Sequence, residues 1–149
     1  MPEKTVSRRA LSPNVRRAQH LLQAGLVGAH VAAFPIVGLF LALSGTDAAA
    51  TAAIGAAVTV AFYTIALAVQ VVVADASPKV VLFAWFASYV TRVSLLGLGL
   101  AAVLAHADRW AWLDPVALFV SVVGTVMGWL GLELWVYSRM RVPVYDDPS

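Results

Sequence analysis

The sequence predicts an all-α protein, a four-helix transmembrane bundle with both the N- and C-termini in the cytoplasm. Hydrophobic residues make up 61% of the 149 residues and charged residues only 12%, whereas an ordinary soluble domain has about 25% charged residues. A soluble fold of this length has too much surface for its volume to bury so many apolar side chains. Four long runs are almost free of charge, and each exceeds the ~20 residues that cross a bilayer as a helix.

These runs place the membrane-spanning helices at approximately residues 20–44, 48–74, 80–106 and 115–138. They are apolar on all sides, which excludes the alternating pattern of a membrane β-strand. A basic cytoplasmic arm, residues 1–19, comes first, and Pro2 and Pro13 argue against one continuous helix there. Residues 16–20 could start a short interfacial turn. The membrane domain covers residues 20–140, and a short cytoplasmic tail, residues 141–149, follows it.

Turn-forming residues separate the predicted helices. Gly45 lies in the first connection and Pro78 in the second. In the third connection, Asp114 can accept hydrogen bonds from the first N–H groups of the last helix, and Pro115 fits its first turn. The alanine-rich tract 48–57 predicts a thin helix wall that packs closely.

The positions of lysine and arginine predict the orientation. One side has the five basic residues of the arm together with Lys79, Arg139 and Arg141, whereas the other side has only Arg109. Positively charged loops stay in the cytoplasm, so both termini and the middle connection are expected there. A twin-arginine export signal at residues 7–11, with removal of the first helix, is the rival interpretation. The length of the first apolar run and the three spans after it favour the uncleaved chain.

Two charged residues lie inside the predicted spans, where a charge costs about 3 kcal/mol or more. Arg92 lies near the middle of the third helix, and Glu133 lies near the cytoplasmic end of the fourth. Side chains lean toward the N-terminus of their helix, so these two groups lean toward each other from antiparallel helices. We expect an intramembrane charged pair. It either fixes the register of the two helices or handles a partner or an ion directly.

A stripe of small residues follows one face of the fourth helix. Its members are Ala117, Ser121, Gly124, Gly128 and Gly131, and two of them form a GxxxG motif. Small residues let helix backbones approach closely in lipid. This face is expected to pack against another helix, and packing within the chain is favoured over packing against a partner.

The other polar residues inside the spans are His30, Gln70, Ser88 and Thr91. His30 could carry protons or bind haem, but the other two histidines lie at membrane edges, where they could not supply a second axial ligand at the same depth. A neutral, hydrogen-bonded His30 is therefore favoured, and Gln70 is expected to bond between helices.

Several kinds of site are excluded or not predicted. The chain has no cysteine, which excludes disulfides and thiolate ligands. No metal or cofactor site is predicted, and the motifs of nucleotide-binding and hydrolytic enzymes are absent. The basic arm suits anionic lipid rather than nucleic acid, because no nucleic-acid-binding module accompanies it.

The third helix resembles a helix of a known family. Residues 86–100, Phe-Ala-Ser-Tyr-Val-Thr-Arg-Val-Ser-Leu-Leu-Gly-Leu-Gly-Leu, are similar to the third helix of ATP synthase protein I and related small membrane proteins. In that family a lone basic residue, here Arg92, follows a small or polar turn and precedes a long apolar run. Residues 54–58 and the polar Glu133 resemble the family as well. The resemblance covers roughly residues 21–141 and rests on topology, size and one basic position.

This resemblance implies a non-catalytic accessory protein of the F-type ATP synthase. Such a protein would lie in the cell (inner) membrane of a bacterium and assist assembly of the c-subunit ring, with lipid and c subunits as its partners. A small membrane transporter or flippase and a membrane anchor of another complex are the alternatives. Four-helix multidrug exporters need a carboxylate deep in the first helix, where this chain has only His30 and Pro35. The sequence does not indicate an oligomeric state.

Overall fold

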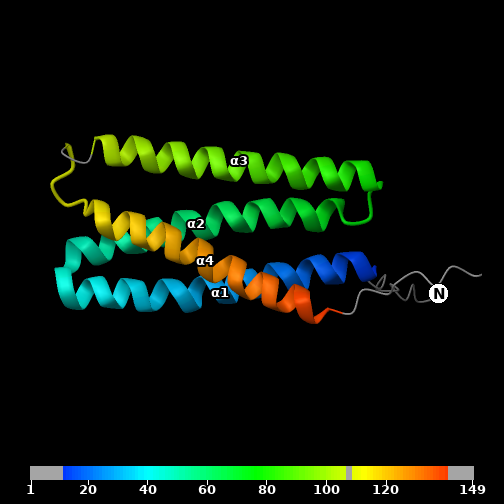
Figure 1. Ribbon diagram of the computed structural model, residues 1–149, viewed down its shortest axis with the longest axis horizontal. Helices are drawn as coiled ribbons and strands as arrows, with labels where there is room; N and C mark the ends of the chain where they lie inside the picture. The colour runs from blue at the N-terminus through cyan, green and yellow to red at the C-terminus, as the bar shows by residue number, and fades with distance from the viewer. Residues whose placement is uncertain (1–11, 107–108, 141–149) are drawn as a thin grey trace, which may run out of the picture.

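The chain folds into long helices. The computed structural model describes residues 12–106 and 109–140, which contain α1 (Pro13–Ser44), α2 (Thr46–Val73), α3 (Pro78–Ala105) and α4 (Pro115–Arg139) and no strand (Figure 1). Each helix is long and apolar enough to cross a membrane. The predicted all-α four-helix transmembrane bundle is therefore confirmed, and the orientation of its termini stays a prediction. The arm before residue 12 and the tail after residue 140 lie outside the described residues.

The start of α1 differs from the expectation. The helix begins at Pro13 rather than near residue 20, and residues 16–20 are helical instead of forming a separate turn. Proline is compatible with the first helical position, where its missing N–H would have no partner within the helix. Ser12 caps this start, because its hydroxyl oxygen accepts a hydrogen bond from the Val15 N–H at 3.1 Å. The Ser12 hydroxyl also donates to Asp75 at 2.7 Å, which connects α1 to the turn between α2 and α3.

The turns at the opposite end of the bundle follow the sequence closely. Gly45 alone separates α1 from α2, and its φ of 89° is a conformation that favours glycine. Asp114 caps α4 as predicted: its Oδ1 accepts hydrogen bonds from the N–H groups of Val116 and Ala117, at 2.9 and 3.0 Å. Pro115 is the first residue of α4.

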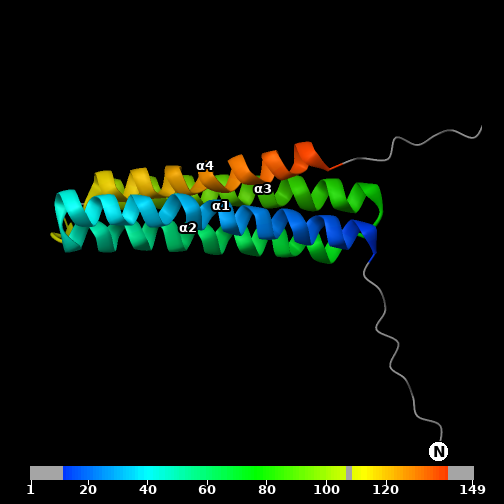
Figure 2. The ribbon, with the colours of Figure 1, turned by 90° about the horizontal axis from the view of Figure 1, so that it is seen from below.

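The helices are not equally embedded in the bundle. α1, α2 and α4 all pack against one another, whereas α3 packs mainly along α2 (Figure 1). No residue of α3 is buried within the described structure. Figure 2 shows α4 lying along one side of the bundle. The fold is therefore a three-helix core with α3 attached at its edge.

The core consists largely of small residues. Ala48, Ala49, Ala52 and Ala56, all in the alanine-rich tract, are buried. This agrees with the closely packed wall that the sequence predicts. The larger side chains gather further along α2 and α4, where Tyr63, Leu67 and Trp129 form a cluster with Ala29 of α1.

Candidate functional site

Arg92 lies halfway along α3, on the side that faces α2. Its guanidinium carbon is 4.6 Å from the centre of the Tyr63 ring, a distance at which an aromatic face attracts a cation. Its Nε–H donates to the backbone carbonyl of Ser88 at 3.3 Å. These are its only polar or cation–π contacts within the described residues. The aromatic ring and the helix backbone thus stabilise a charge that lipid would disfavour.

Glu133 lies on α4 and has a different partner. One of its carboxylate oxygens accepts a hydrogen bond from the indole N–H of Trp129 at 2.9 Å. Within the described residues it makes no ion pair with Arg92, so the direct pair expected from the sequence is not observed. The reason lies in the path of α4. This helix contacts α2 near Ser121 and α1 near Gly128, so its later turns lie away from α3 (Figure 1).

Two aromatic rings fill the space between the charged residues. The rings of Tyr63 and Trp129 have centroids 5.2 Å apart in a tilted arrangement, a favourable geometry for aromatic side chains. The order Arg92, Tyr63, Trp129, Glu133 therefore crosses the bundle from α3 through α2 to α4. We call these four residues the transverse row. Sequence reasoning missed both aromatic members, although Trp129 precedes Glu133 by one helical turn and that spacing could have indicated their contact.

The small-residue stripe of α4 packs mainly within the chain. A methyl group added at Gly128 would lie 2.5 Å from the Gly28 carbonyl oxygen, and one added at Gly124 would collide with Ile36. Ser121 is fully buried and lies against Gly55 of α2. Gly131 differs, because a methyl group there would have no neighbour within 4 Å in the described structure.

The sequence interpretation missed the matching face of α1. Gly25 lies against the Trp129 indole and Gly28 against the Gly128 backbone, so that a side chain at either position would collide with α4. Gly28 and Ala32, four residues apart, form the small-xxx-small pattern that could have indicated this face.

The remaining polar residues are spread over different surfaces. His30 is exposed on α1, and its Nδ1 lies 2.7 Å from the Leu26 carbonyl oxygen. The Nε2 of Gln70 is buried without a hydrogen-bond partner in the described structure. Ser88 accepts a hydrogen bond from Arg92 through its backbone, and Thr91 is exposed. The structure brings Ser88 together with Arg92, and it does not gather these four residues into one site.

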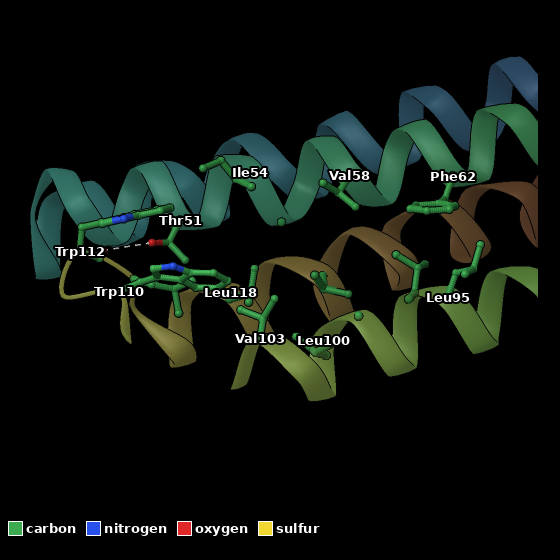
Figure 3. Close-up of a pocket in the computed structure, with 15 residues that line it drawn as sticks. Thr51, Ile54, Val58, Phe62, Leu95, Leu100, Val103, Trp110, Trp112 and Leu118 are labelled. Carbon is green, nitrogen blue, oxygen red and sulfur yellow. Dashed lines mark hydrogen bonds between the residues drawn. The ribbon is translucent and has the colours of Figure 1, made fainter. Parts of the chain in front are cut away.

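A cavity of about 470 Å³ lies between α2, α3 and α4, on the Gly45 side of the transverse row (Figure 3). Its lining is apolar except for Thr51 and the ring N–H groups of two tryptophans. The lining residues are Thr51, Ile54, Gly55, Val58, Phe62, Leu95, Leu96, Gly99, Leu100, Val103, Trp110, Trp112, Leu113, Leu118 and Val122.

Thr51 lies at the Gly45 end of this cavity and contacts the connection between α3 and α4. The Thr51 hydroxyl donates to the Asp47 carbonyl oxygen of its own helix at 2.8 Å and accepts from the Asp114 N–H at 3.3 Å, and the Trp112 carbonyl oxygen lies 3.5 Å from it. Figure 3 shows Trp110 and Trp112 beside Thr51 at this end. The connection between α3 and α4 is thereby fixed against α2.

The site is thus defined by two features, the transverse row and the apolar cavity beside it. Packing of this kind does not by itself specify a function, which depends on the chemistry of particular residues. Comparison of the chain with protein-family models, with curated proteins and with solved structures found no match.

Proposed function

We propose that the protein is a non-enzymatic accessory protein that receives a transmembrane helix of another membrane protein against α3. The observation that carries this proposal is the state of Arg92. Its terminal amino groups have no hydrogen-bond acceptor within the described residues. An arginine held at mid-membrane depth is best complemented by a carboxylate, which can accept two parallel hydrogen bonds from the guanidinium group.

The surroundings of Arg92 support access from outside the chain. α3 packs mainly along α2, and none of its residues is buried in the described structure. Gly97 has no neighbour within 4 Å of an added methyl group. A second helix could therefore approach α3 closely on a flank that α2 does not cover.

The partner that we propose is the c subunit of the F-type ATP synthase. The resemblance of residues 86–100 to ATP synthase protein I supports this choice, and assistance in c-ring assembly is the role that follows from it. In this proposal the docking surface is α3 with Arg92. The stripe of α4 contributes no more than Gly131, because Gly124 and Gly128 are covered by α1.

Co-purification of the c subunit with the tagged protein from detergent-solubilised membranes tests the proposal. Replacement Arg92→Gln is expected to lower c-subunit recovery about tenfold, since a charge-assisted hydrogen bond contributes about 1.5–3 kcal/mol. Arg92→Lys should retain part of the binding, because it keeps the charge. Arg139→Gln is the matched control: Arg139 also lies over an aromatic ring, 5.0 Å from the centre of Trp135, but at the end of α4.

Two results would contradict the proposal. One is a wild-type protein that recovers no c subunit, and the other is equal recovery with wild type and Arg92→Gln. Thermal denaturation of each purified variant shows whether loss of binding reflects loss of fold.

A gene position beside the ATP synthase subunit genes would support the proposed partner independently. If the purified protein carried a solute across the membrane of proteoliposomes, and Arg92→Gln abolished that flux, a transporter would be favoured instead.

A further inference from the structure

We propose that the cavity between α2, α3 and α4 is a binding site for one acyl chain of a membrane phospholipid. The cavity has a volume of about 470 Å³, within the range of about 300–1,000 Å³ that is usual for small-molecule sites. Apart from the Thr51 hydroxyl and two indole N–H groups, its lining offers no side-chain hydrogen-bonding group. A polar or charged ligand would therefore lose its hydration there without compensation.

The length of the cavity matches one leaflet of a bilayer. Along α2 its lining extends from Thr51 to Phe62, which corresponds to about 16 Å at the helical rise of 1.5 Å per residue. The hydrocarbon core of a bilayer is about 30 Å thick, so one leaflet occupies about 15 Å. A single acyl chain lying parallel to α2 would fill this length.

The two ends of the cavity have the chemistry that an acyl chain requires. At the Gly45 end are Trp110 and Trp112, side chains that favour the level of the lipid headgroups. Arg109, which directly precedes Trp110, is the only lysine or arginine at that end of the described chain, and it could attract a phosphate. At the other end the lining consists of Phe62 and Leu95, next to Tyr63 and Arg92 of the transverse row.

Lipid has direct access to this space. α3 and α4 have little contact with each other, so the groove between them is not closed by protein. Both helices are long and apolar enough to lie in the bilayer. A lipid chain can therefore enter sideways from the bilayer. It would supply to α3 and α4 the packing contacts that the two helices do not make with each other.

Two glycines of α3 supply a matched pair of variants. A side chain added at Gly99 or at Gly97 would meet nothing within 4 Å, so both positions tolerate a larger residue. Only Gly99 lines the cavity. Gly99→Phe therefore places a ring in the proposed chain site, and Gly97→Phe adds the same ring to α3 outside it.

Native mass spectrometry of the full chain, exchanged into dioleoylphosphatidylglycerol, measures the retained lipid. We expect wild type and Gly97→Phe to keep one phospholipid per chain under activation that strips the remaining lipid. Gly99→Phe should lower that population about tenfold, because ring and chain cannot occupy the same space. Gly99→Leu repeats the test with a smaller side chain if the phenylalanine variant expresses poorly.

The proposal is overturned if the three proteins retain lipid equally, if Gly97→Phe loses it as Gly99→Phe does, or if wild type retains none. Protein purified without lipid exchange gives a further check on the ligand. Recovery of an isoprenoid in place of a phospholipid would contradict the acyl-chain assignment. This site is independent of the proposed helix-docking role of Arg92, so a failed c-subunit experiment leaves it standing.

Discussion

Trp129 is the residue around which the three core helices meet. Its side chain is fully buried, with Tyr63 of α2 on one side and Gly25 of α1 on another. Its indole N–H also satisfies one oxygen of Glu133. One residue thereby joins the apolar packing of the core to a charged group inside the membrane.

Replacement Trp129→Ala is expected to lower the free energy of unfolding by about 3–5 kcal/mol, because it leaves a large cavity in the core. Trp135→Ala, on the exposed side of the same helix, should change it by less than about 1 kcal/mol. Denaturation by sodium dodecyl sulfate in mixed micelles measures both values. Equal losses in the two variants would show that the core is not centred on Trp129.

Replacement of glycine by alanine should have opposite effects on stability at Gly45 and at Gly38. Gly45 has a φ of 89° and a ψ of −170°, so Gly45→Ala should destabilise the fold by about 1–3 kcal/mol. Gly38 lies inside α1 with open space around it, so Gly38→Ala should stabilise the helix by about 0.5–1 kcal/mol. Thermal denaturation in detergent compares the two. A shift of the same sign in both would refute the strained-turn explanation.

At the level of whole helices, the contact between α1 and α4 depends on glycine. Gly28 and Gly128 lie against each other's backbone, so neither helix can carry a side chain at the crossing point. Close approach of this kind replaces the hydrophobic effect as the force between helices in lipid. Within the described residues α3 has no comparable contact, which explains why it lies at the edge of the bundle.

Gly128→Leu is expected to separate α1 from α4 and to lower the free energy of unfolding by about 1–3 kcal/mol. Gly131→Leu is the matched control on the same helix, since nothing lies within 4 Å of a side chain added there. Melting temperatures of the detergent-purified variants provide the comparison. If Gly131→Leu proves as harmful as Gly128→Leu, the contact surface has been assigned to the wrong face of α4.

The helices could be predicted from the sequence because their length and apolar character are local properties. The Asp114 cap and the glycine turn at Gly45 are local in the same sense. The contact between Trp129 and Glu133 is local too, because the two residues are one helical turn apart. The separation of Glu133 from Arg92 was not predictable in this way, because it depends on the path of α4 across α2 toward α1. That path is set by Gly28 and Gly128, which lie far apart in the chain. The positions of Arg92 and Glu133 along their helices could therefore be predicted from the sequence, and their lateral separation could not.

For the molecule as a whole, the orientation in the membrane is the prediction that the charges make most directly. The chain has no cysteine of its own, so single cysteines can be introduced without background. Ser77→Cys and Ser138→Cys should be protected from an impermeant maleimide in intact cells, and Ala111→Cys should react. Labelling of Ser77→Cys or Ser138→Cys in intact cells would show that the orientation is the opposite of the one predicted.

The glycine contact between α1 and α4 has a consequence for biosynthesis. α1 leaves the ribosome before α4, so their contact can form only after α4 has been inserted. Until then Gly25 and Gly28 face lipid without their partner. The α1–α2 pair, joined by a single residue, can associate early, whereas the contact between α1 and α4 waits until α4 has been synthesised. A chain that stops before α4 would lack the contact that holds its first helix in place.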